Sequence, residues 1–258
     1  MRDISDYEKQ YLNDYDFERY MVAYRRKNIL NVMSKYPHKR ILEIGCGMEP
    51  LFIYLDDEFD EYTIIEPSDT FYNNAKMLLS KRERERKRER ERENIEIIHD
   101  FFDEKQSKIL EQKYDYIIIS SLLHEIEKPE LFLKALLDIC NQETRVYINV
   151  PNANSLHRIL AKESGLISSV SEKSNRNRIM QQNHVFDMNT LIELITTSIP
   201  NAEIIEKGSY FVKPFSHKQM ELCLSCNIFG EDILVGFDNI IRYFPEHGAE
   251  IYVLFNIP

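Results

Sequence analysis

Short apolar runs alternate with longer amphipathic or charged stretches through the first 150 residues of the chain. Apolar runs of this length, closed by polar turns, are typical of strands that are buried on both faces of a sheet. Five strands are predicted, over 41–44, 62–66, 95–98, 115–120 and 145–150. Because helical stretches separate them, we predict an α/β fold with a parallel sheet between two helical layers.

The stretches between the strands predict helices. Residues 1–36 contain neither Gly nor Pro, and Tyr20 and Tyr24 recur at helical spacing, so we expect a helical N-terminal segment. Further helices are predicted over 69–94, 129–142 and 187–198, the last capped by Asp187. Two more strands are predicted over 202–207 and 249–256.

Two connections in the second half of the chain are unusually long, 151–183 and 208–248. Connections beyond about 12–15 residues in a compact domain usually carry function. We therefore expect both to form lids over the carboxyl edge of the sheet, as insertions in one domain that spans 37–258.

Charge and composition exclude several function classes. The 258 residues are 43% hydrophobic and include 43 acidic against 33 basic side chains, a net charge of −10. Dedicated nucleic-acid binders gain their affinity from cations on phosphates, so we expect no nucleic-acid partner.

Residues 81–93 form a charged run that is net basic, unlike the rest of the chain, with eight basic and five acidic side chains. Their alternation favours a solvated helix extension with i,i+3 ion pairs over a handle for an anionic partner.

Signals for secretion, membrane insertion and metal binding are weak or missing. The first 20 residues lack the basic and apolar regions of a signal peptide, and no apolar run approaches the about 20 residues that span a bilayer. Four cysteines are too few for a disulfide framework. Cys223 and Cys226 form one isolated C-x-x-C pair, which we interpret as packing rather than as a metal site. We expect a cytoplasmic protein with no membrane partner and no metal.

The strongest chemical signal follows the first predicted strand. Gly45 and Gly47 flank Cys46, and glycine lets a turn adopt positive φ and lets a ligand approach the bare backbone. We expect a helix to begin after them and to offer free N–H groups to a ligand. Pro50 stands where a dinucleotide-binding fingerprint needs its third glycine, which argues against a pyrophosphate ligand.

Polar side chains also end the next three predicted strands. Glu66 closes the second strand, where a carboxylate can accept hydrogen bonds from both hydroxyls of a ribose. Asp100 and Phe101 follow the third strand, where an acid can accept from the exocyclic amine of a base while a ring packs on it. Ser120 ends the fourth strand, shortly before His124. Since the carboxyl ends of parallel strands share one edge, we expect a single ligand site there.

This ordered set, from Glu43-x-Gly-x-Gly to Ser-Ser-x-Leu-His-Glu, resembles class I S-adenosylmethionine-dependent methyltransferases over about residues 38–150. Segments 150–158, 183–186 and 208–215 resemble a small bacterial branch whose members often act in surface-glycan and other polar-metabolite pathways. The resemblance implies a Rossmann-like sheet of seven strands in the order 3-2-1-4-5-7-6, with the last antiparallel. It also implies that segment 1–36 lies over the site of S-adenosylmethionine. The family usually has a third glycine where this chain has Glu49.

The resemblance also assigns roles in the cofactor site. The cofactor-binding residues that it implies are Arg25, Glu43, Gly45, Cys46, Gly47, Glu66, Pro67, Asp100, Phe101 and Ser120. The backbone of 45–47 would hold the methionine moiety, and Glu43 would orient either that loop or the amino group. Arg25 would pair with the cofactor carboxylate, or is a surface arginine. The sulfonium of S-adenosylmethionine is a cation, which suits a site lined by carboxylates.

Three histidines are candidate catalytic residues, His124, His157 and His184. A hydroxyl acceptor must lose a proton, and histidine is suited to take it near neutral pH. Each has a structural alternative, since His124 can cap a turn and His157 or His184 can tie a lid to the sheet. Lys213 and His217, in the second lid, are weaker candidates for contact with an anionic acceptor.

We therefore expect methyl transfer from S-adenosylmethionine to a small polar acceptor, at a hydroxyl of a sugar or a surface-polysaccharide precursor. Two alternatives stay open, N-methylation of a small metabolite and a non-catalytic scaffold that binds the cofactor. A nucleotide-dependent oxidoreductase would need the third loop glycine and tolerance of pyrophosphate, which this sequence does not offer.

Overall fold

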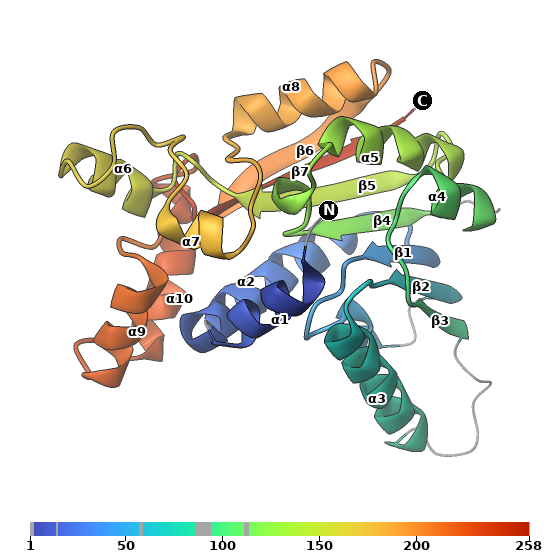
Figure 1. Ribbon diagram of the computed structural model, residues 1–258, viewed down its shortest axis with the longest axis horizontal. Coiled ribbons are helices and arrows are strands. Elements are labelled where there is room, and N and C mark those ends of the chain that lie inside the picture. The colour runs from blue at the N-terminus through green and yellow to red at the C-terminus, as the bar shows by residue number, and fades with distance from the viewer. Residues whose placement is uncertain (1–2, 14, 57–58, 86–93, 111–113, 258) are drawn as a thin grey trace.

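The computed structural model describes residues 3–13, 15–56, 59–85, 94–110 and 114–257. Figure 1 shows a twisted sheet with helices on both faces and a group of helices at one end. Its strands are β1 (Arg40–Ile44), β2 (Glu61–Ile65), β3 (Asn94–Ile98), β4 (Tyr116–Ser120), β5 (Arg145–Pro151), β6 (Glu203–Tyr210) and β7 (Glu250–Asn256), in the order β3-β2-β1-β4-β5-β7-β6. Strands β1 to β5 are parallel and β7 is antiparallel to both of its neighbours. The predicted Rossmann-like fold and its strand order are confirmed.

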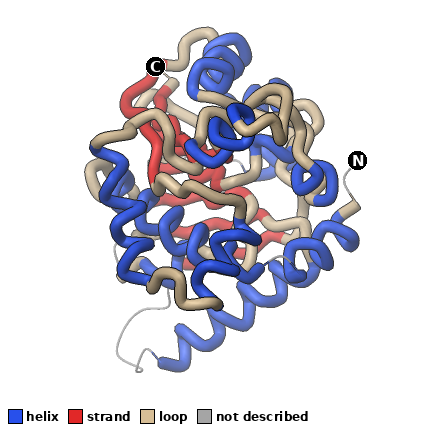
Figure 2. Tube along the Cα trace, turned by 90° about the vertical axis from the view of Figure 1, so that its left-hand side faces the viewer, coloured by secondary structure: helices blue, strands red, loops and turns tan. Residues whose placement is uncertain are grey.

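Helices form the two layers and the lids. The described α-helices are α1 (Ile4–Asn13), α2 (Tyr15–Met33), α3 (Asp69–Glu85), α4 (Glu104–Leu110), α5 (Pro129–Ala135), α6 (Leu156–Glu163), α7 (Asn175–Ile179), α8 (Met188–Ser198), α9 (His217–Ser225) and α10 (Glu231–Asn239). Short 3-10 turns lie at Leu51–Tyr54, Leu123–Glu125, Leu136–Asp138 and Ile240–Arg242. In Figure 1, α6, α7, α9 and α10 gather at the end of the sheet where β5 finishes. The turned view in Figure 2 shows helices on both sides of the strands.

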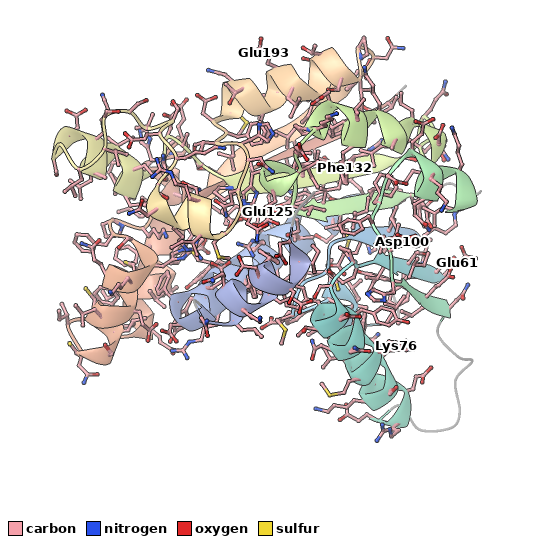
Figure 3. The ribbon with its side chains drawn as sticks, viewed as in Figure 1. Glu61, Lys76, Asp100, Glu125, Phe132 and Glu193 are labelled. Atoms are coloured by element: carbon pink, nitrogen blue, oxygen red, sulfur yellow. The ribbon has the colours of Figure 1, made fainter. Side chains whose placement is uncertain are left out.

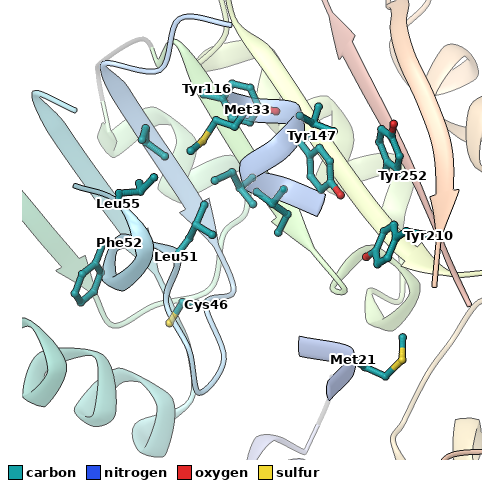
Figure 4. Close-up of a cluster of buried hydrophobic side chains, with 14 of the residues drawn as sticks. Met21, Met33, Cys46, Leu51, Phe52, Leu55, Tyr116, Tyr147, Tyr210 and Tyr252 are labelled. Carbon is teal, nitrogen blue, oxygen red and sulfur yellow. The ribbon is translucent and has the colours of Figure 1, made fainter. Parts of the chain in front are cut away.

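Alternating side chains of the central strands fill two separate cores. Tyr116 and Ile118 of β4 pack in the core beneath α2, whereas Ile117 and Ile119 pack in the core beneath α5 and α8. All four side chains are fully buried, because β4 lies between two other strands and under helices on both faces. Figure 4 shows the first of these cores, where Met33 of α2 lies beside Tyr116.

Strand β6 is longer than the sequence predicts. It continues through Gly208 to Tyr210, whereas the predicted strand ends at residue 207 and the predicted connection begins at 208. Gly208 pairs with Tyr252 of β7, and a Cβ atom at Gly208 would lie 2.9 Å from the Tyr252 ring. The glycine therefore makes room for an aromatic side chain instead of ending the strand.

Two of the predicted helices differ from the structure, and a third is described only in part. The N-terminal segment forms two helices, α1 and α2, with position 14 outside the described residues. The helix expected after the glycine loop is a single 3-10 turn, because Pro50 and Leu55 hold extended backbone on either side of it. Helix α3 is described as far as Glu85, and the rest of the predicted helix, with most of the charged run, lies outside the described residues. No helix in the described part of the chain is long and apolar enough to cross a bilayer.

Candidate cofactor and acceptor site

A cavity of about 1370 Å³ lies at the carboxyl edge of the parallel strands. One half is walled by the glycine loop after β1, the ends of β2 and β4, and helix α1. The other half is walled by helices α2, α6 and α7 and by the segment that joins β6 to α9. The volume exceeds the roughly 300–1,000 Å³ of a pocket for one drug-sized ligand, so a cofactor and a small acceptor fit together.

The glycine loop has the backbone conformation that a close ligand requires. Gly45 has φ +76° and Gly47 has φ +59°, the left-handed region that favours glycine. A Cβ atom at Gly47 would meet no atom within 4 Å, because that position faces the open cavity, whereas one at Gly45 would lie 3.2 Å from the Leu122 side chain. Burial, followed by the charges of nearby carboxylates, raises the pKa of the Cys46 thiol well above its usual value. Cys46 is therefore a small packing group in the loop and not a nucleophile.

Glu43 organises this loop from below. Its carboxylate is fully buried, with Oε1 3.1 Å from Arg26 Nη1 and Oε2 accepting from Leu51 N at 2.9 Å and from the Tyr62 hydroxyl at 2.8 Å. Burial raises the pKa of Glu43, while the Arg26 charge and these hydrogen bonds oppose that rise. Glu43 is not among the described residues that line the cavity. Of the two roles inferred for it, this placement supports orienting the loop.

Arg26 is a residue of this site that the sequence analysis missed. Its Nη2 donates to the carbonyl of Cys46 at 2.9 Å and to the carbonyl of Glu49, so one guanidinium joins β1 to both ends of the loop. Adjacent residues on a helix point about 100° apart, so Arg26 and Arg25 reach different partners. Nothing in the local sequence distinguishes the two arginines, and only the packing of α2 against β1 shows which one holds the loop.

Glu66 reaches from the end of β2 to the same loop. It is 4% exposed, its Oε1 accepts from Ser68 N at 2.9 Å, and its Oε2 accepts from Gly47 N at 3.3 Å. Burial raises the pKa of Glu66 to about 7, against these hydrogen bonds. Because burial keeps water from this carboxylate, it would gain from the two donors of a ribose diol. Its neighbour Pro67 also lines the cavity.

The far wall of the cofactor half presents aromatic and hydroxyl groups. Phe101 is 44% exposed and lines the cavity together with Phe102. Asp100 accepts from the backbone N–H of Phe101 at 2.7 Å and is not among the described residues on the cavity wall. Ser120 lies on that wall, and its Oγ is buried with no hydrogen-bond partner within the described part of the chain. An orphaned hydroxyl at the wall of a cavity indicates a polar ligand there.

Arg25 lies at the junction of the two halves and is already paired. Its Nε lies 3.1 and 3.0 Å from the two carboxylate oxygens of Glu250, and its Nη2 lies 3.1 Å from Glu18 Oε1. Burial alone would lower the pKa of Arg25, but the charges of Glu250 and Glu18 raise it well above its usual value. Asn149 and Tyr210 also donate to Glu250. Contact between Arg25 and a cofactor carboxylate stays a prediction.

The lid half brings together two histidines and two cations. His157, Arg176, Lys213 and His217 all line the cavity, on α6, α7, the β6–α9 segment and α9. Glu18 Oε2 lies 3.1 Å from Arg176 Nη2 and 3.5 Å from His217 Nδ1. Burial, followed by the charge of Lys213, lowers the pKa of both histidines well below the usual value of 6.5. Both imidazoles are therefore neutral at pH 7, each with one ring nitrogen that is not protonated.

The other two candidate histidines lie elsewhere. His124 and His184 line a separate pocket of about 20 Å³, and neither is among the described residues of the large cavity. The carbonyl of His124 accepts from the N–H groups of Asn183 and His184 at 2.9 Å each, which ties the first lid to the sheet. Glu125, beside His124, does line the large cavity, and Figure 3 shows it at the middle of the molecule near α7.

These features fit S-adenosylmethionine. The glycine loop leaves room for the methionine moiety, Glu66 offers acceptors to a ribose, and Phe101 offers a face to the adenine. The hydroxyl of Ser120 has no partner among the residues that the structure describes. The carboxylates at the wall suit a sulfonium, which a phosphate-binding loop would repel.

Comparison with known proteins agrees with this geometry. A profile of the methyltransferase domain family matches residues 17–198, more than half of the chain. None of the curated proteins is a significant match to the sequence.

Solved structures share the fold. The plantazolicin methyltransferase BamL, in complex with a triazolic desmethylPZN analog and SAH, has a TM-score of 0.61 and 18% identity, covering 96% of this chain and 89% of its own. The plantazolicin methyltransferase BpumL, in complex with SAH, has a TM-score of 0.54 and 19% identity, covering 98% and 88%. The methyltransferase domain of bacterial CtHen1-C has a TM-score of 0.54 and 13% identity, covering 90% and 96%. The fold, the cofactor cradle and the family match together lead to one conclusion: this chain belongs to the methyltransferase domain family and is a class I S-adenosylmethionine-dependent methyltransferase.

Proposed function

We propose that the protein methylates a hydroxyl of a small polar acceptor, such as a sugar or a surface-polysaccharide precursor. The observation that carries this proposal is that the cofactor cradle and the neutral imidazole of His157 belong to one cavity. An acceptor in the lid half would therefore lie between a methyl donor and a proton acceptor. Holding two reactants in the correct geometry in this way accounts for much of the rate acceleration of a displacement reaction.

Each part of the cavity has a role in this mechanism. When bound, S-adenosylmethionine supplies an electrophilic methyl group on its sulfonium. Glu66 and the loop of Gly45 and Gly47 hold its position, and Ser120 lies on the wall between them and β5. An unprotonated ring nitrogen of His157 takes the proton of the acceptor hydroxyl as the oxygen becomes a nucleophile. The lids exclude water, which would compete for the methyl group.

His124 and His184 would act indirectly, without contact with the acceptor. Because both lie at the small pocket where the first lid joins the sheet, we propose that they position the lid that carries His157.

A second acceptor class is N-methylation of a small metabolite or peptide product. The likeness to the plantazolicin methyltransferase BamL, which covers 96% of this chain, supports a larger natural product as the acceptor and leaves the methylated atom open. BamL was crystallised with a triazolic desmethylPZN analog. A neutral histidine can remove a proton from an ammonium as well as from a hydroxyl, so the geometry of His157 serves either acceptor.

The test has two stages. Calorimetry of the purified chain with S-adenosylhomocysteine, with NAD as the control ligand, measures occupancy of the cofactor half. Turnover of labelled S-adenosylmethionine is then measured against sugars, sugar nucleotides and amines, and the methylated atom is identified by NMR. Methylation at a sugar oxygen supports the proposal, methylation at nitrogen replaces it with the second class, and binding without turnover of any class contradicts both.

A further inference from the structure

One face of helix α6 forms part of the wall of the lid half. The side chains on this face lie at the i, i+3, i+4 and i+7 spacing of a single helix face, and they are His157, Leu160, Ala161 and Ser164. None of the α6 side chains is buried, and Leu160 is 44% exposed. This face of α6 therefore borders the cavity instead of the protein core.

These side chains follow a definite order along α6. The helix begins at Leu156, shortly after β5 ends at Pro151, so His157 in its first turn is the member nearest the edge of the sheet. Leu160 and Ala161 lie about one turn, or about 5 Å, further along the helix axis. Figure 1 shows α6 at the outer end of the group of lid helices. The cavity wall thus changes along α6 from an imidazole to apolar side chains.

The turn that ends α6 adds two more apolar residues to this wall. Gly165 has φ +72°, and its N–H donates to the carbonyl of Lys162 at 2.9 Å. The N–H of Leu166 donates to the carbonyl of Ala161, also at 2.9 Å, which completes the Schellman motif that ends a helix. Leu166, which is 78% exposed, and Ile167 both line the cavity. The apolar part of the wall therefore continues past the last turn of α6.

Arg158 fixes the loop that follows this turn. Its Nε donates to the carbonyl of Val170 at 2.8 Å, and its Nη2 donates to the carbonyl of Glu172. Both bonds tie the loop back to α6. The apolar residues between them and the helix are therefore held by hydrogen bonds within the lid, as a binding surface requires.

The second lid contributes to the same wall. Pro214 and Phe215 lie in the segment between β6 and α9, and both line the cavity. Phe215 is 39% exposed, so part of its ring is accessible to a ligand. The apolar residues that the two lids contribute, called the outer apolar wall below, are Leu160, Ala161, Leu166, Ile167, Pro214 and Phe215.

Polar side chains of the lid half gather at the other end of α6. The charges of Lys213 and Arg176 act on His157, so these two cations lie near the inner end of the helix. Ligand pockets are mainly apolar, with a few polar groups that fix the orientation of the ligand. The lid half has this character, with its polar groups near His157 and its apolar surface further out.

We propose that the methyl acceptor is amphipathic, with a polar end that reaches His157 and an attached apolar group that lies against the outer apolar wall. This inference rests on the proposed function and narrows its acceptor to a polar group that carries an alkyl, acyl or aromatic substituent. The helix rises about 10 Å between His157 and Ser164, which sets the length of the apolar group that α6 can cover.

The experiment uses the protein saturated with S-adenosylhomocysteine, so that the cofactor half is filled. Methyl, butyl, hexyl and octyl β-D-glucosides are the probes, titrated by calorimetry below their micelle-forming concentrations. They share one polar head and differ only in the length of the alkyl chain. We expect the affinity to rise with chain length, and octyl glucoside to bind at least about tenfold more tightly than methyl glucoside.

Two variants of the outer apolar wall locate the alkyl chain. Leu160→Gln and Leu166→Gln should each weaken octyl glucoside about fivefold, and leave the affinities for methyl glucoside and S-adenosylhomocysteine within about twofold. Both side chains are exposed, so neither variant should impair folding. Leu222→Gln is the matched control, because Leu222 is 58% exposed on α9 and is not among the described residues of the cavity wall. It should leave binding of every probe unchanged.

Four results would overturn the inference. If S-adenosylhomocysteine binds but affinity does not rise with chain length, the acceptor has no apolar group at this wall, while methyl transfer stands. If Leu222→Gln weakens octyl glucoside as much as the two lid variants do, the alkyl chain binds the protein surface at large. If no glucoside binds and Leu166→Gln converts a dimer into a monomer, the wall is an interface between two copies of this chain. If S-adenosylhomocysteine itself does not bind, the proposed function fails together with the inference.

Discussion

Arg26 Nη1 lies 3.1 Å from Glu43 Oε1, and this buried ion pair joins helix α2 to strand β1 beneath the cofactor loop. The same guanidinium binds the carbonyls of Cys46 and Glu49. The shape of the loop therefore depends on a helix that begins 30 residues earlier in the chain, at Tyr15. Loop shape and protein stability are coupled through this one contact.

Arg26→Met should destabilise the fold strongly, because it leaves the Glu43 carboxylate buried without its cation. Removal of one partner of a buried pair costs about 3–5 kcal/mol. Arg40→Met is the control, since its pair with Asp115 is 42% and 24% exposed and such pairs contribute about 1 kcal/mol or less. Urea unfolding measures both changes. Equal small losses in the two variants would show that the Arg26 pair is not structural.

Glu66→Ala should weaken S-adenosylhomocysteine binding by more than about tenfold, because the buried ribose hydroxyls lose their acceptor. Calorimetry measures this directly. Glu61→Ala, at the opposite end of β2 from the cavity, is the control and should leave the affinity unchanged. Unchanged affinity in Glu66→Ala would exclude the ribose assignment.

Glu66 should also make the stability of the cofactor-free protein depend on pH. Burial raises its pKa from 4.5 to about 7, so between these values the folded state binds more protons than the unfolded state. Stability should therefore fall as the pH rises from about 4.5 to 7, by on the order of 3 kcal/mol from this group. Cofactor affinity should change in the opposite sense, since the ionised carboxylate is the better acceptor.

Glu66→Gln removes the titration and keeps the shape of the side chain. The difference in unfolding free energy between this variant and the native protein, measured at several pH values, isolates the contribution of Glu66. A difference that does not vary between pH 5 and 8 would contradict the raised pKa.

His157→Ala should lower kcat by about 100-fold or more and leave S-adenosylhomocysteine affinity within about twofold. Because burial and Lys213 hold the pKa of His157 well below 6.5, the rate of the native enzyme should not fall between pH 8 and 6.5. His184→Ala, in the small pocket, should have a smaller effect through the lid. An equal loss in the two variants would move the proton acceptor away from His157.

Glu8→Ala should speed the release of S-adenosylhomocysteine about tenfold, because Glu8 fastens α1 over the cofactor half. Its carboxylate accepts from the hydroxyls of Ser68 and Thr70, and these bonds lower its pKa against the effect of burial. Stopped-flow measurement of dissociation is the readout. Glu104→Ala, which breaks an exposed pair with Lys108 on α4, is the control. Equal dissociation rates in the two variants would show that α1 does not gate the cofactor.

The strand ends were predictable because their chemistry is local. Glu66 and Ser120 each close an apolar run, and any parallel sheet brings such positions to one edge. The helix expected after the glycine loop was wrong, since Pro50 and the short connection to β2 leave room for one 3-10 turn. The strand end predicted at residue 207 was wrong because Gly208 pairs with Tyr252, which is distant in sequence.

The sequence by itself determined the α/β class and the edge of the sheet where a ligand site is expected, because these follow from periodicity and from residues that are adjacent along the chain. The identity of the cofactor came from the resemblance that the motifs carry. Only the tertiary structure decided that His157 lines the cavity while His124 and His184 do not, and that Arg26 holds the loop. The physical reason is that the role of a side chain on a lid or a helix depends on the residues that it contacts in the folded chain. That partner is set by long-range packing, which local patterns do not encode.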